Sequence, residues 1–85
     1  MSILVDVTQE DIENGVAEDC LSCPIAIALE RATNKKWAVG SEEVCPNDFI
    51  GPVYRLPQSA RRFINRFDSG GVVKPFRFRF PGDSR

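Results

Sequence analysis

The sequence contains no histidine, only three cysteines and a single tryptophan among its 85 residues. Without histidine, the side chain used most often for general acid–base catalysis is missing, and zinc motifs that depend on imidazole are excluded. An odd number of cysteines argues against a secreted disulfide framework, in which cysteines pair. The composition therefore favours a protein that binds over one that catalyses.

Long apolar runs and phosphate-binding loops are also missing. No apolar run approaches the ~20 residues that a membrane-spanning helix needs. The first residues, MSILVDVTQED, contain neither basic side chains nor a long apolar segment. The sequence has no G-x-x-x-x-G-K loop and no G-x-S-x-G elbow. We therefore expect a cytoplasmic, non-enzymatic protein with no cofactor and no membrane partner.

The apolar pattern predicts one small domain over residues 1–85, with an α+β fold and a mostly antiparallel sheet. Alternating apolar residues place strands within residues 3–8, 35–40, 53–56 and 72–80. Helical spacing places helices within residues 8–15, 24–33 and 57–69. The predicted order is β-α-α-β-β-α-β, and the segment 41–52, which is rich in turn residues, is expected to be mainly loop.

The helix boundaries carry specific signals. Thr8 begins TQED, which matches the S/T-x-x-[DE] pattern of a capping box, and Gly15 is expected to end the first helix. Pro24 and Pro57 suit the first turn of the next two helices, where the missing N–H needs no helical partner.

Three apolar stripes are candidates for the core. They comprise Leu21, Ile25, Ala28, Leu29 and Ala32; then Ala60, Phe63, Ile64 and Phe67; and finally Phe76, Phe78 and Phe80. Ile27 lies nearly opposite the first stripe, so that helix needs cover on two sides, from the fold or from another subunit. Pro75 places the last strand at a sheet edge or limits its pairing there.

Charge is divided unevenly along the chain. Residues 1–50 contain ten acidic and three basic side chains, a net charge of −7, whereas residues 51–85 contain eight basic and two acidic ones, a net charge of +6. Either the two halves interleave and neutralise each other, or the domain has a basic face suited to an anionic ligand or to an acidic partner.

Five arginines are the candidate ligand-binding residues, namely Arg61, Arg62, Arg66, Arg77 and Arg79. Helical spacing places Arg62 and Arg66 one turn apart and opposite the apolar stripe, while Arg77 and Arg79 alternate with the phenylalanines of the last strand. The planar guanidinium matches phosphate and carboxylate groups. If helix and strand present these faces together they form one basic surface; otherwise they form a solvated outer face with scattered ion pairs.

The motif DCLSCP places Cys20 and Cys23 at C-x-x-C spacing just before Pro24. A zinc site would need four ligands, so Cys20, Cys23 and Cys45 would require Asp19, Asp48 or a second subunit. A redox pair is the second alternative, because a thiol at a helix start has a lowered pKa. The reading we favour is structural: Cys23 caps a helix that begins at Pro24, and Cys20 packs as a small apolar group. We therefore expect no bound metal.

Two stretches, VTQEDIENGVAEDCLSCPIAIALERA and YRLPQSARRFINRFDSGGVVKPFRFRF, carry a distinctive set of spacings. The pattern T-x-x-[DE]-I-x-x-G, C-x-x-C-P-[IV]-A-x-A-L, L-P-x-x-A-x-x-F-I-x-x-F-D and P-F-x-F resembles that of small uncharacterised proteins encoded by bacteriophages and their bacterial hosts. The resemblance covers nearly the whole chain and implies a phage or prophage setting, hence the host cytoplasm. It supplies no activity and no binding residues.

These observations lead to one main hypothesis and two alternatives. The main hypothesis is a phage-type binding protein that counters host defence, either by sequestering an anionic, nucleotide-like ligand or by blocking an acidic host protein, through its arginines. The alternatives are a small nucleic-acid-binding module, which the net charge of −1 disfavours, and a cysteine-based zinc or redox protein. The small core, Ile27 and the edge strand also predict a homodimer or a larger even oligomer.

Overall fold

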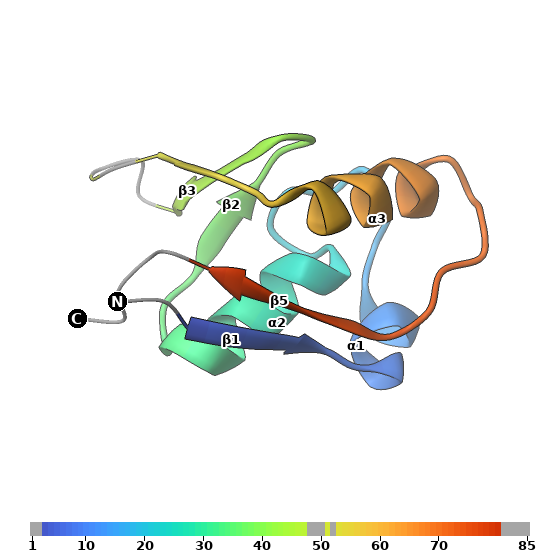
Figure 1. Ribbon diagram of the computed structural model, residues 1–85, viewed down its shortest axis with the longest axis horizontal. Helices are drawn as coiled ribbons and strands as arrows, with labels where there is room; N and C mark the ends of the chain where they lie inside the picture. Colours follow the sequence, from blue (N-terminus) through green and yellow to red (C-terminus); the bar gives the residue numbers. More distant parts are fainter. Residues whose placement is uncertain (1–2, 48–50, 52, 81–85) are drawn as a thin grey trace.

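The computed structural model describes residues 3–47, 51 and 53–80 (Figure 1). Its elements in chain order are β1 (Ile3–Val7), α1 (Gln9–Asn14), α2 (Pro24–Thr33), β2 (Trp37–Val39), β3 (Glu43–Pro46), β4 (Tyr54–Arg55), α3 (Gln58–Asp68) and β5 (Phe76–Phe80). The α+β fold and the order of the predicted elements are confirmed. The segment expected to be mainly loop contributes one further short strand, β3, because Val44 is buried there and pairs with both neighbouring strands.

The strands form two antiparallel sheets. β1 pairs with β5 from Ile3 opposite Phe80 to Val7 opposite Phe76, so the first and last described elements lie side by side (Figure 1). β2, β3 and β4 form the second sheet in that order. Since strand side chains alternate between faces, the β1–β5 pair turns valines and phenylalanines toward the core and leaves Asp6 and the strand arginines outside.

The core lies between these sheets and helices α2 and α3. Trp37, Tyr54 and Phe80 meet edge to face, with ring centroids 5.1 to 6.1 Å apart, and so join the two sheets. The Trp37 indole N–H donates to Thr33 Oγ1 at 2.7 Å, and that hydroxyl donates to the Leu29 carbonyl at 2.7 Å. The indole N–H that Trp37 brings into the core is thereby satisfied.

Helix α1 begins and ends as the sequence predicts. The Asp11 N–H donates to Thr8 Oγ1 at 3.2 Å, and the Thr8 N–H donates to Asp11 Oδ2 at 2.9 Å, which completes the capping box. Gly15 follows the helix at a point of close approach, since a Cβ there would lie 2.5 Å from Pro24 Cδ. Glycine therefore allows α1 and the start of α2 to pack together.

Helix α2 begins at Pro24 as predicted, but two positions of its predicted stripe are wrong. Leu21 is half exposed because it lies in a turn before the helix, where helical spacing does not apply. Ala32 is exposed, whereas Ala26 and Thr33 are buried, because the buried side of the helix is rotated toward Trp37. Ile27 is half-buried.

Helix α3 follows the prediction closely. Ala60, Phe63 and Ile64 are buried and Phe67 is half-buried, so the stripe faces the core along its whole length. Phe63 also contacts Phe76, with ring centroids 4.8 Å apart, which ties α3 to the start of β5. The opposite side of α3 consequently faces solvent.

Candidate functional site

The arginines of α3 lie beside two hollows in the surface. Arg62 and Arg66 are exposed because the helix buries its opposite side, and Arg61 is half-buried on the flank. Arg62 borders both hollows, so the two are neighbours along the helix. We refer to Arg55, Arg61, Arg62, Arg66 and Lys74, which line one or both hollows, as the basic face of α3.

The first hollow, here called the polar hollow, has a volume of about 340 Å³. Its lining residues are Ser41, Glu42, Arg55, Gln58, Arg61, Arg62 and Asn65. Backbone pairing builds it, because the Leu56 N–H donates to the Glu42 carbonyl at 2.9 Å and holds the turn before β3 against the start of α3. The hollow thus combines three guanidinium groups with amide and hydroxyl groups.

Glu42 is the one acidic side chain lining the polar hollow, and it lies near Arg55. Their closest charged atoms are 3.9 Å apart, and both side chains are about two-thirds exposed, at 66% and 68%. A pair so exposed contributes little to stability. It does offset the charge of Arg55, which leaves Arg61 and Arg62 as the net positive groups of this hollow.

The second hollow, here called the mixed hollow, has a volume of about 410 Å³. Its lining residues are Ser59, Arg62, Phe63, Arg66, Val72, Val73, Lys74, Pro75 and Phe76. Val72 is 82% exposed and gives the hollow an open apolar wall. None of the described residues that line it is acidic, so three cations and an apolar wall meet here.

The Gly70-Gly71 turn positions that apolar wall. Gly70 has a φ of 82°, a left-handed conformation that glycine adopts without strain. The Gly71 N–H donates to the Arg66 carbonyl at 2.8 Å, and a Cβ on Gly71 would lie 2.7 Å from Arg66 Cγ. The chain therefore returns along α3 at close range and brings Val72 and Lys74 next to Arg66.

Four of the five cations of the basic face have no acidic partner among the described residues. Within the described part of the chain, Arg61, Arg62, Arg66 and Lys74 form no ion pair. The Nε of Arg61 is buried without a hydrogen-bond partner among the described residues. A buried donor with no acceptor is costly, so unpartnered groups of this kind are rare in folded proteins.

The two predicted strand arginines lie elsewhere. Arg77 and Arg79 are exposed on the outer side of β5, and neither lines the polar or the mixed hollow. Arg77 Nε lies 3.7 Å from Asp6 Oδ1, and Arg79 stands opposite Leu4 in the sheet register. The hollows bring together three of the five predicted arginines and add Arg55 and Lys74, which the sequence did not single out.

Arg31 has the opposite environment to the arginines of α3. It donates to both carboxylate oxygens of Asp11, at 2.8 and 2.7 Å, and to the Asp6 carbonyl at 2.8 Å. Burial acts to raise the pKa of Asp11, but hydrogen bonds from Arg31 and Thr8 outweigh it and hold that pKa below its usual value. Since Asp11 is only 2% exposed, this pair is part of the packed structure.

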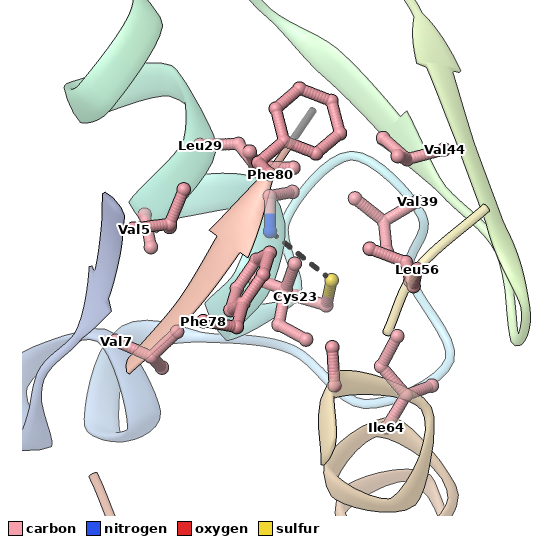
Figure 2. Packing of buried hydrophobic residues seen from close by; sticks show 14 of the residues in the cluster. Val5, Val7, Cys23, Leu29, Val39, Val44, Leu56, Ile64, Phe78 and Phe80 are labelled. Carbon is pink, nitrogen blue, oxygen red and sulfur yellow. Dashed lines mark hydrogen bonds between the residues drawn. The ribbon is translucent and has the colours of Figure 1, made fainter. Parts of the chain in front are cut away.

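The three cysteines differ in burial: Cys23 is buried, Cys45 is half-buried and Cys20 is exposed. Cys23 is buried in the core, and its sulfur accepts from the Ala26 N–H at 3.4 Å (Figure 2), so the predicted cap is confirmed. Burial raises the pKa of the Cys23 thiol, which keeps it protonated and poorly nucleophilic at neutral pH. Cys20 is exposed, so its predicted apolar packing is wrong: it lies in the turn before α2, where its carbonyl bonds to the Val39 N–H.

Cys20 and Cys45 both line a further open hollow of about 590 Å³, the largest of those described here. Its charged lining residues are Glu42 and Glu43, so it does not suit an anion. In residues 3–47, 51 and 53–80, no three histidine, cysteine, aspartate or glutamate side chains are grouped to hold a metal ion. Asp48, one of the suggested zinc ligands, lies outside the described residues.

No helix within the described ranges is long and apolar enough to cross a membrane. In comparisons with protein-family models, with curated proteins and with solved structures, nothing matches this chain. The functional assignment consequently rests on the residues and their geometry.

Proposed function

We propose that this protein is a non-enzymatic binding protein that holds an anionic ligand, or an acidic surface of a protein partner, on the basic face of α3. The observation that carries the proposal is the grouping beside two adjacent hollows of Arg61, Arg62 and Arg66, none of which forms an ion pair with another described residue. Arginines without internal partners have their hydrogen-bond donors free for an external phosphate or carboxylate.

The spacing of the arginines along α3 also supports the proposal, because it holds like charges close together on one helix. Arg62 and Arg66 are separated by one helical turn, and arginines at that spacing repel each other. A chain that needed these residues only for solubility would gain from acidic neighbours at the same spacing, yet α3 carries none in its first turn. A bound anion would relieve this repulsion.

The biological setting belongs to the same proposal. The motif spacings resemble those of phage and prophage proteins, so we place the protein in the host cytoplasm, where it counters host defence by sequestering an anionic compound or by blocking an acidic host protein. The resemblance alone supports this setting.

Calorimetric titration tests the anion-binding proposal with two matched charge reversals. Arg62→Glu changes the residue that borders both hollows, while Arg79→Glu makes the same charge change at an exposed arginine on β5 that lines neither hollow. The probes are tripolyphosphate and an acidic peptide. We expect Arg62→Glu to weaken binding at least about tenfold and Arg79→Glu to weaken it less than about twofold. Equal losses in both variants would contradict the placement on α3.

Self-association is a further part of the proposal. Within the described residues β1 and β5 pair only with each other, so each has a free edge, and Leu4 is 48% exposed on their outer side. These features support a homodimer or a larger even oligomer. Light scattering coupled to size exclusion tests this, and a mass near 9.5 kDa at all concentrations would contradict it.

A further inference from the structure

We infer that the ligand of the basic face is a small phosphorylated compound with a planar ring, of the nucleotide class, with its phosphate in the polar hollow and its ring in the mixed hollow. This inference rests on the proposed function and specifies its ligand. It follows from the different chemistry of the two hollows and from the single residue, Arg62, that they share.

The polar hollow has the donors that a phosphate needs. Arg61 and Arg62 present guanidinium groups that no carboxylate of the described chain occupies, and Gln58 and Asn65 add amide N–H donors one helical turn on either side. Charge-assisted hydrogen bonds from arginine to phosphate are short and directional. The Nε of Arg61 has no hydrogen-bond partner among the described residues.

The mixed hollow has what a planar ring needs. Val72 and Pro75 provide exposed apolar surface, and Phe76 lies half-buried behind it. Arg66 also lines this hollow, and a guanidinium plane can stack on an aromatic ring. An inorganic anion would make no use of this apolar wall, whereas a ring attached to a phosphate would cover it.

The sizes of the hollows suit parts of one small molecule. Their volumes, about 340 and 410 Å³, fall at the lower end of the range for small-ligand sites, which runs from roughly 300 to 1,000 Å³. A nucleic-acid strand would need a longer basic track, and beyond these hollows Arg77 already faces Asp6. The geometry favours a single nucleotide over a polymer.

The decisive experiment is a calorimetric comparison of ATP, tripolyphosphate, adenosine and a single-stranded oligonucleotide at one fixed ionic strength. We expect ATP to bind at least about tenfold more tightly than tripolyphosphate, and both to bind more tightly than adenosine. Equal affinities for ATP and tripolyphosphate would overturn this inference and leave the proposed function standing. An absence of binding by ATP, tripolyphosphate and the oligonucleotide would overturn this inference and the anionic-ligand branch of the proposed function, leaving only the acidic protein partner. A preference for the oligonucleotide over ATP would overturn the single-nucleotide inference.

A valine pair provides the matched variants. Val72→Ser removes exposed apolar surface from the mixed hollow, and Val53→Ser does the same at a 59% exposed valine that lines the cysteine-containing hollow instead. We expect Val72→Ser to weaken ATP binding about threefold or more without changing tripolyphosphate binding, and Val53→Ser to change neither. An unchanged affinity of Val72→Ser for ATP would overturn the placement of the ring.

Discussion

Arg31 and the arginines of α3 carry the same side chain in contrasting surroundings. Arg31 forms a two-pronged ion pair with the buried carboxylate of Asp11, at 2.7 and 2.8 Å, and a third bond to a backbone carbonyl. Arg61, Arg62 and Arg66 have no ion pair among the described residues. An arginine whose hydrogen-bond donors already have acceptors within the chain contributes to folding, whereas an arginine without such acceptors retains its donors for binding.

The difference originates in the acidic partner. Asp11 is fixed by the capping box of α1, which holds it at 2% exposure and in register with Arg31. α3 has no equivalent, since the one acidic residue in its sequence, Asp68 at its C-terminal end, accepts a hydrogen bond from the Glu18 N–H at 2.9 Å. The comparison predicts that changes at Asp11 affect stability and that changes on α3 affect binding.

The largest effect on stability is expected for Asp11→Ala. The substitution removes the carboxylate that accepts from the Arg31 guanidinium and from the Thr8 N–H, and leaves Arg31 only its bond to the Asp6 carbonyl. We expect this to cost about 2–3 kcal/mol of unfolding free energy, because one partner of the ion pair is buried and the other is half exposed. Urea denaturation measures it. Glu10→Ala, at an exposed position of the same helix, is the control and should cost less than about 0.5 kcal/mol; equal losses would contradict a special role for Asp11.

Lowering the pH should remove part of the stability that the Asp11 carboxylate contributes. The pKa of Asp11 is lowered by folding, so the unfolded chain binds the proton more readily and its uptake favours unfolding. The contribution is therefore complete above the ordinary value of 3.8 and is lost as the pH falls through the lower pKa of the folded state. Asp11→Asn should show a smaller loss of stability than the wild type between about pH 6 and pH 3, and parallel curves would contradict the assignment.

A smaller effect on stability is expected at Thr8, the N-cap residue of α1. Thr8→Ala removes the hydroxyl that accepts from the Asp11 N–H, and N-cap substitutions of this kind cost about 1 kcal/mol. Thr8→Ser keeps the hydroxyl and should retain most of the stability. Both are compared by urea denaturation, and a Thr8→Ser variant as unstable as Thr8→Ala would show that the side-chain hydrogen bond is not responsible.

Much of the fold was predictable because its signals are local. Thr8, Gly15 and Pro24 mark helix ends through their own backbone chemistry, and the structure confirms all three positions. β3 was not predicted, because Pro46 and the turn residues beside it indicate a loop, and only pairing with two distant strands makes this segment extended. Local signals specify helix ends, but strand formation here depends on tertiary contacts.

The site was predictable only in part, for a related reason. Arg61, Arg62 and Arg66 share one helix, so their grouping follows from helical spacing. Arg55 and Lys74 come from segments on either side of α3, and backbone pairing at Glu42 and the turn at Gly71 bring them beside it. The exposure of Cys20 was missed in the same way, since its position depends on a bond to β2.

The smallest effect on stability is expected on α3. Arg62→Gln and Arg66→Gln remove exposed charges without internal partners, so each should change the unfolding free energy by less than about 0.5 kcal/mol. Arg31→Gln, the matched change at a paired arginine, should cost clearly more. Urea denaturation of the three variants tests this, and a larger loss at Arg62 than at Arg31 would reverse the comparison.

The most direct test of the central claim, that the basic face of α3 binds anions, is a two-dimensional ¹⁵N–¹H NMR titration of the full chain with tripolyphosphate. We expect saturable shift changes confined to residues around Arg55, along α3 from Gln58 to Arg66, and in the return segment from Gly71 to Lys74. The amides of Arg79 and Cys45, which lie outside both hollows, should stay in place. Unchanged spectra, or shifts centred on β5, would contradict the claim.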